Sequence, residues 1–355
     1  MATKSNLYKV HHEWATRPDE ERFLTLEDLA NYTKEKMLNS YPIGCQLRDL
    51  TCNPGEDFLT LSGEGLPNSN HLSPWAYTQL CSSVRAPQRY INGLSPELAT
   101  DCLNFGIKKS GLGVQILTGT SQIRALTSLS YGRIWDNQVV SSVVELFGDR
   151  WKVPSASYSA VNPKQATTLY ASDRDVFIFL VNEEDDIQSG DVVLHRGIMA
   201  WNSEVGARTF GVCHFLYEFV CDNRIIWGVS EVKELVFRHT SAAPWRFGEM
   251  EGVLRSAIAG ESAMDIRFVL RGAQSHVLGQ STEAVVEAVE KFGFLKPEAA
   301  RAIELAEMGE AGPCDPWSLW GAVQGLTKYA QSLPFTDERV QFERKAGKIL
   351  ERVAV

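Results

Sequence analysis

The stretch 175–240 constrains the fold most, because strand-like segments alternate there with short polar links. The segments are rich in β-branched and aromatic residues, and the links are short enough for hairpins. The expected strands are 175–181, 192–204, 210–228 and 231–237. Side chains alternate between two faces along a strand, so one face is expected to be core and the other partly solvated. The sequence therefore predicts an antiparallel β-meander.

After the meander, the spacing of apolar residues becomes helical. Residues 246–260 carry apolar side chains three and four positions apart, which predicts a helix that packs against the meander. The later segments each begin with a cap residue or proline and are separated by glycine or proline. The predicted fold class is α+β, with a central antiparallel β-meander, a packing helix and a helical C-terminal third.

Upstream of the meander, the sequence predicts further helices and strands. Thr25, Ser73 and Ser95 are suited to cap helices, and the two serines precede a proline that suits the first helical turn. The other expected elements are a hairpin near 45–62, strands at 114–119 and 123–128, and a short helix at 138–148. We divide the chain into a mixed segment (1–110), a central sheet with its helix (111–260) and a helical segment (261–355).

The charge and cysteine content limit the partners. The 355 residues include 44 acidic and 35 basic side chains, and the net charge of −9 argues against binding nucleic acid over the whole surface. Seven cysteines without a repeating interval favour reduced thiols over a disulfide framework. No apolar run reaches the roughly 18 residues of a membrane span. We expect a cytoplasmic protein with no membrane partner.

The common catalytic and metal-binding signatures are absent, which favours a binding protein over an enzyme. Cys213 and Cys221 stand out together with His195, His214 and His239. However, eight residues along one strand separate the two cysteines by roughly 26 Å.

The acidic run 183–186 is more typical of a solvated hairpin tip than of a cation site. We therefore expect no metal and no cofactor.

Cations and aromatic residues near the sheet are candidates for nucleic-acid binding. The window 102–135 contains four cations and no carboxylate. Cations that meet phosphates beside aromatics that stack on bases are typical of single-strand binding. The candidates are Arg124, Tyr131, Arg133, Trp135, Arg196 and Arg238. Each arginine taken alone also fits an ordinary surface ion pair.

A second candidate site lies at the end of the expected strand 192–204. Polar and aromatic residues before a turn that contains glycine could form a binding edge, although a turn stabilised by its own side chains is the alternative. The residues concerned are Trp201, Asn202, Glu204 and Arg208.

Several blocks of the sequence resemble a family of phage- and plasmid-related proteins known only as a domain of unknown function. The blocks include HHEWATRPDEERFLTLEDL, IRALTSLSYGRIWD and WSLWGAVQGLTKYAQ. The resemblance covers nearly the whole chain and implies a mobile-element origin. Residues 192–260 are also similar, at the level of architecture, to single-strand annealing proteins of the Red-beta and RecT kind.

These observations lead to two functional hypotheses. The first is a phage- or prophage-encoded DNA-transaction protein, with a role in recombination, that binds or anneals single-stranded DNA without a cofactor. The second is a protein-binding module that acts on a host factor, for example in counter-defence, which suits the acidic charge. A metal-dependent nuclease is disfavoured, because no set of carboxylates has suitable spacing. We also expect a homo-oligomer.

Overall fold

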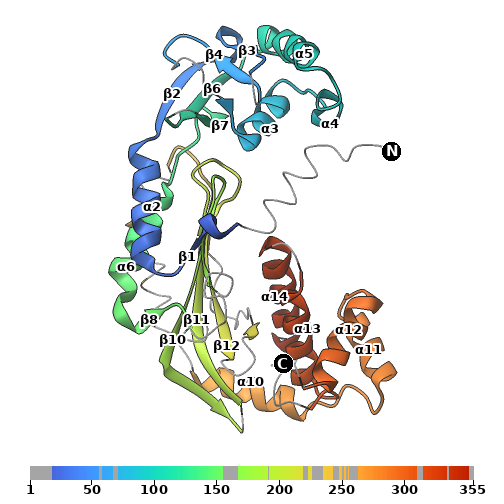
Figure 1. Ribbon diagram of the computed structural model, residues 1–355. Coiled ribbons are helices and arrows are strands. Elements are labelled where there is room, and N and C mark those ends of the chain that lie inside the picture. The colour runs from blue at the N-terminus through green and yellow to red at the C-terminus, as the bar shows by residue number, and fades with distance from the viewer. Residues whose placement is uncertain are drawn as a thin grey trace.

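The computed structural model of the chain has the predicted α+β class (Figure 1). It describes residues 18–55, 58–66, 71–120, 122–154, 167–190, 192–218, 223–225, 235–242, 248–249, 252, 255, 263–309, 315–333 and 336–351. Over these ranges, no helix is long and apolar enough to cross a membrane. The helix expected at 246–260 falls largely outside them.

The predicted meander is confirmed as the centre of the larger sheet. In this sheet β10, β11 and β12 pair consecutively and antiparallel, and β1 and β9 extend it beyond β10. Short strands β8 and β14 pair with β10 and β12, and β13 pairs with the end of β12. The strands are β1 (Arg22–Phe23), β8 (Trp151–Lys152), β9 (Leu169–Ala171), β10 (Val176–Ser189), β11 (Val192–Asn202), β12 (Phe210–Glu218), β13 (Asn223–Ile225) and β14 (Leu235–Phe237).

The turn between β10 and β11 is shorter than the sequence predicts. Residues 182–191 were expected as a polar turn, but β10 continues to Ser189, with a bulge between Asn182 and Asp186. The reason is Ile187, which pairs with Leu194 and is fully buried with it in the C-terminal core. Burial of this pair extends the hairpin, so the acidic residues lie along a strand and not at its tip.

A smaller sheet lies in the N-terminal half and is covered by three helices, α3, α4 and α5 (Figure 1). Its strand order is β2-β6-β7-β5-β4-β3, so β6 and β7 belong with the earlier strands and the boundary proposed at residue 110 cuts through the sheet. The hairpin β3–β4 and the two proline-started helices agree with the prediction. The elements are β2 (Tyr41–Gln46), β3 (Thr51–Asn53), β4 (Thr60–Ser62), β5 (His71–Leu72), α3 (Pro74–Ser83), α4 (Gln88–Ile91), α5 (Pro96–Lys109), β6 (Gly113–Thr118) and β7 (Gln122–Ser128).

Two helices, α2 (Leu26–Leu38) and α6 (Asp136–Phe147), lie side by side against the larger sheet (Figure 1). The hydroxyl oxygen of Thr25 accepts the N–H of Asp28 at 3.1 Å, which confirms the predicted cap of α2. Apolar residues of both helices and of β10 and β11 form one core. Each helix connects directly to the smaller sheet, since β2 follows α2 and β7 precedes α6.

The C-terminal third is helical, as predicted. Its helices form a separate core that also includes Ile187 and Leu194 from the end of the β10–β11 hairpin. This core fixes the helices against the far end of the larger sheet (Figure 1). The helices are α10 (Ala263–Ser275), α11 (Thr282–Lys291), α12 (Lys296–Glu307), α13 (Leu319–Gln331) and α14 (Thr336–Glu351).

Candidate functional site

The link that follows β11 joins the two sheets. The side chains of Trp75 and Gln79, both on α3, donate hydrogen bonds to the carbonyl of Val205 at 3.0 and 2.9 Å. The amide oxygen of Gln79 in turn accepts the backbone N–H of Leu126 on β7. Val205, which follows the end of β11, is therefore held against α3 and β7 of the smaller sheet.

Glu204 is the centre of a buried ionic network at this junction. Its side chain is almost completely buried, and Oε1 lies 2.5 Å from Nη2 of Arg124. Nη1 of the same arginine donates to Oγ of Ser40 at 2.9 Å. Burial opposes the charged guanidinium, but the carboxylates of Glu204, Asp173 and Asp136 together outweigh it, so the pKa of Arg124 is raised. The ion pair therefore joins β7 to the end of β11.

Arg133 belongs to the same network. It donates from Nη2 to Oε1 of Gln115 at 2.7 Å and from Nη1 to the carbonyl of Glu204. Its guanidinium also lies 5.2 and 5.6 Å from the ring centroids of Tyr131 and Trp135, which is within cation–π range. Burial lowers the pKa of Arg133. This arginine therefore fastens the segment before α6 to the smaller sheet.

Asp136, the first residue of α6, adds a second buried carboxylate. Nδ2 of Asn202 donates to Oδ1 of Asp136 at 2.7 Å and to the carbonyl of Ile134 at 2.9 Å. Burial, and then the negative charge of Glu204, raise the pKa of Asp136 well above its ordinary value. Two carboxylates and two guanidinium groups are thus enclosed together.

The surface role predicted for the arginines is wrong for two of them. Arg124 is only 5% exposed and Arg133 only 8%, so neither lies on a solvated face of the sheet. Both arginines instead belong to the junction, where the rings of Tyr131 and Trp135 lie beside Arg133. The ring of Tyr131 is stacked on His239, with centroids 5.1 Å apart.

The other nominated cations lie elsewhere. Arg238 is exposed, just before His239, whereas Arg196 is half-buried on β11. Arg196 precedes Asn202 by six residues along the strand, which is about 20 Å. Arg196 therefore does not join the network.

The predicted binding edge is also buried. Trp201 faces Gly211 across the sheet, and a Cβ at that glycine would lie 2.0 Å from the indole ring, so the ring occupies the space that a side chain would need. Nε of Arg208 lies 2.9 Å from Oδ2 of Asp175, and its guanidinium lies over the ring of Phe177. Trp201, Asn202 and Glu204 are buried and Arg208 is half-buried, so these residues do not form an exposed edge. Only Asn202 and Glu204 belong to the junction, whereas Trp201 packs with Phe177 in the larger sheet.

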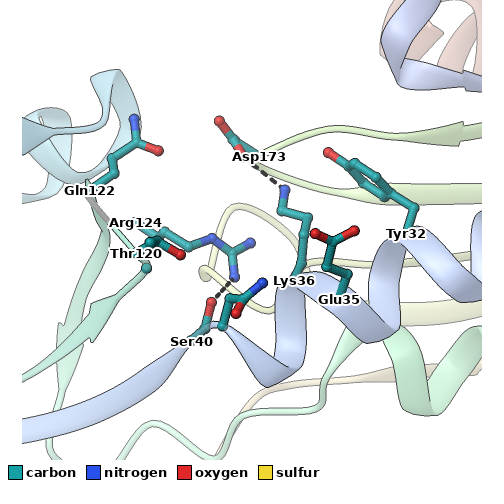
Figure 2. Close-up of a pocket in the computed structure, with 10 residues that line it drawn as sticks. Tyr32, Glu35, Lys36, Ser40, Thr120, Gln122, Arg124 and Asp173 are labelled. Carbon is teal, nitrogen blue, oxygen red and sulfur yellow. Dashed lines mark hydrogen bonds and ion pairs between the residues drawn. The ribbon is translucent and has the colours of Figure 1, made fainter.

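A pocket of about 320 Å³ opens beside the network, between the end of α2 and the start of β7 (Figure 2). Nζ of Lys36 donates to Oδ1 of Asp173 at 2.7 Å and to the carbonyl of Ser172 at 2.9 Å. Burial works against the ammonium group, but the charge and hydrogen bond of Asp173, together with Tyr32, outweigh it, so the pKa of Lys36 is raised. The pocket is lined by Tyr32, Glu35, Lys36, Asn39, Ser40, Gly119, Thr120, Gln122, Arg124 and Asp173.

Four polar side chains in this pocket have no hydrogen-bond or ion-pair partner among the described residues: Glu35, Asn39, Thr120 and Gln122.

Apart from Arg124, sequence reasoning missed the pocket residues. In the sequence Glu35 and Lys36 resemble ordinary charged helix residues, and Asp173 lies in a loop, so the sequence carries no signal that unites them. Their proximity follows from the packing of α2 beside the larger sheet.

Metal binding finds no geometric support in the ranges that the structure describes. No group of three His, Cys, Asp or Glu side chains there could hold an ion. Nδ1 of His195 lies 3.0 Å from Oδ1 of Asp186, and His239 stacks on Tyr131. The side chains of Cys213, His214 and Cys221 lie outside the described part of the structure.

No family model, no curated protein and no solved structure matches the chain.

Proposed function

We propose that the protein binds single-stranded DNA without a cofactor, as a DNA-transaction protein of a phage or prophage. The observation that carries this proposal is an exposed aromatic residue beside cations on α5. Phe105 is 66% exposed, and Nζ of Lys109 lies 4.1 Å from its ring centroid. Lys108, also exposed, adjoins Lys109. Cations that neutralise phosphates and rings that stack on bases are the two ingredients of sequence-tolerant single-strand binding.

A second pair of the same kind lies on α4, over the same sheet (Figure 1). Tyr90 is 64% exposed and follows Arg89, which is also exposed. Arg85 lies nearby in the sequence, in the link between α3 and α4, and is exposed as well. An acidic protein must confine phosphate contacts to a few cations, and the helices of the smaller sheet supply such a group. Among the arginines that the sequence analysis nominated, Arg238 is exposed and remains a candidate for a phosphate contact.

The proposal includes a mobile-element origin and action in the host cytoplasm. It also includes a role in recombination and a homo-oligomeric state. The mobile-element origin follows from the resemblance to phage- and plasmid-related proteins, and the role in recombination follows from the architectural resemblance to annealing proteins. Residues 192–260 contain the strands β11 and β12 on which that second resemblance depends.

Fluorescence anisotropy of a labelled oligonucleotide, measured over a range of salt concentrations, tests the proposal. Binding should weaken log-linearly with salt, with a slope of about −0.7 per phosphate contacted. Changing Arg89→Ala and Lys109→Ala together should reduce the slope by about 1.4. The double variant Lys291→Ala and Lys296→Ala, at exposed positions of the C-terminal helices, is the control and should leave the slope unchanged.

The stacking contribution has its own variant. Phe105→Ala should weaken binding by about 1 to 3 kcal/mol, the range for loss of one base–aromatic stack. Phe268→Ala on α10 is the matched control, because Phe268 is also an exposed phenylalanine on a helix. If the wild-type protein shows no salt-sensitive binding at micromolar concentration, the proposal is wrong.

Binding to a host protein is the second candidate. Leu98 and Phe105 lie seven residues apart on α5 and share one helix face, and both are exposed. Exposed apolar residues that gather on one face favour protein partners. Loss of partner capture by Phe105→Ala, with no DNA binding by the wild type, would favour this second function.

A further inference from the structure

We propose that the pocket between α2 and β7 holds one base of the bound strand and prefers a base with an exocyclic amino group. The inference rests on the proposed function, because it assigns a base-binding role to a site that single-stranded DNA would have to reach. The pocket is open to solvent. Arg124, which belongs to the ionic network, is part of its lining (Figure 2).

The charges of the pocket argue against a phosphate as its occupant. Lys36 is paired with Asp173 at 2.7 Å, and Arg124 is paired with Glu204 at 2.5 Å. Each cation is therefore already neutralised by a carboxylate. The carboxylate of Glu35 has no ionic partner among the described residues, so the lining has no excess of positive charge. A neutral polar ligand fits this balance better than an anion.

The uncommitted polar groups match the edge of a base. Glu35 offers acceptor oxygens only, whereas the amides of Asn39 and Gln122 each offer both a donor and an acceptor. A carboxylate accepts a hydrogen bond from the amino group of cytosine, and the amides can pair with the neighbouring ring nitrogen. Uracil and thymine carry a carbonyl oxygen at C4, where cytosine carries its amino group. This oxygen and the carboxylate are both acceptors, so they cannot form a hydrogen bond with each other.

The arrangement of these groups leaves space for a flat ligand. Figure 2 shows Glu35 and Lys36 on α2, with Gln122 and Arg124 on the opposite side of the pocket. The volume of about 320 Å³ is near the lower end of the range for small-molecule pockets, about 300 to 1,000 Å³, and suits a single base better than a larger ligand. Insertion of an unstacked base between hydrogen-bonding side chains is a common mode of single-strand recognition.

Two oligonucleotides that differ at the base edge test the inference. Oligodeoxycytidine and oligodeoxyuridine of about 12 nucleotides differ in the group at C4 and in the proton at N3, and they carry the same backbone charge. At neutral pH, the wild-type protein should bind the cytidine strand about tenfold more tightly, which is within the range for one well-formed base contact. Equal affinities would overturn the base pocket and leave the proposed function intact.

Substitution of Glu35 tests the assigned contact. In Glu35→Ala the ratio of the two affinities should fall to about one. Because Glu35 is exposed, the melting temperature should change little. Glu27→Ala, at another exposed position of the same helix, removes the same charge and should keep the tenfold ratio. A preference that survives in Glu35→Ala would overturn the inference, and failure of the wild type to bind either strand would overturn the proposed function as well.

Discussion

Oε2 of Glu204 accepts the backbone N–H of Asp136 at 3.1 Å, so α6 begins against a carboxylate that comes from the end of β11. The preceding residue, Trp135, supplies no side-chain cap. The first N–H groups of a helix lack partners within the helix, and the helix dipole favours a negative charge at this end. Because the other oxygen of Glu204 is paired with Arg124, one side chain joins both sheets and α6.

The first prediction is that Glu204→Gln strongly destabilises the fold. The variant leaves the guanidinium of Arg124 buried beside a neutral amide, and breaking a buried ion pair costs about 3 to 5 kcal/mol. Urea unfolding measures the change. Glu304→Gln is the control, because Glu304 pairs with Arg301 on the surface, where such a pair contributes about 1 kcal/mol or less. Similar losses in the two variants would contradict a central role for Glu204.

The second prediction concerns the pH dependence that Asp136 causes. Its pKa is raised in the folded state, so between the unfolded and folded pKa values the native state holds a proton that the unfolded state has released. Stability contributed by this group is therefore present at low pH and is lost as pH rises through that window.

Asp136→Asn should remove this loss. The variant keeps an acceptor oxygen for Asn202, and it cannot ionise beside Glu204. Its stability relative to the wild type should therefore increase with pH, by about 1.4 kcal/mol for each unit by which the two pKa values differ. Urea unfolding at a series of pH values from about 5 to 8 measures this difference. Parallel profiles for the two proteins would show that Asp136 is not the titrating group.

Local signals were sufficient to predict most of the elements. Thr25, Ser73 and Ser95 each accept an N–H at the start of a helix, and this signal depends only on residues three positions apart. The extension of β10 could not be found in this way. Residues 182–186 are polar, and only the burial of Ile187 against the C-terminal helices explains why the strand continues.

The burial of the junction was not predictable from local pattern. Arg124 and Glu204 are 80 positions apart in the sequence, and each alone resembles an ordinary surface residue. A charged side chain is usually exposed unless it is paired, so the prediction that Arg124 faces solvent followed the general rule. The pairing depends on the contact between two sheets, and no periodicity within either sheet carries that information.

The third prediction concerns His239, whose burial lowers its pKa to about 4. Nδ1 accepts the N–H of Ile134 at 3.4 Å, and protonation of that nitrogen would break this contact. Because the folded pKa is below the ordinary value of 6.5, the unfolded state binds more protons between the two values. Stability should therefore fall as pH decreases from about 6.5 toward 4, by on the order of 3 kcal/mol at most.

The variant His239→Gln tests this assignment. It should lose the part of the acid sensitivity that His239 causes, as measured by thermal unfolding at a series of pH values. His276→Gln, at an exposed position after α10, is the control and should keep the wild-type profile. If both variants retain that profile, His239 does not control acid stability.

The last prediction concerns the packing of the C-terminal helices. A Cβ at Gly325 on α13 would lie 2.1 Å from the carbonyl oxygen of Ala302 on α12. Alanine favours a helix over glycine by about 1 kcal/mol, but rotation of a side chain cannot relieve a contact with backbone, so the helices must move apart. Gly325→Ala should therefore destabilise the protein by about 1 to 3 kcal/mol in urea unfolding. Gly111→Ala is the control, because no heavy atom lies within 4 Å of its Cβ position, and it should change stability by less than about 1 kcal/mol. A neutral result at Gly325 would show that α12 and α13 do not pack as closely in solution.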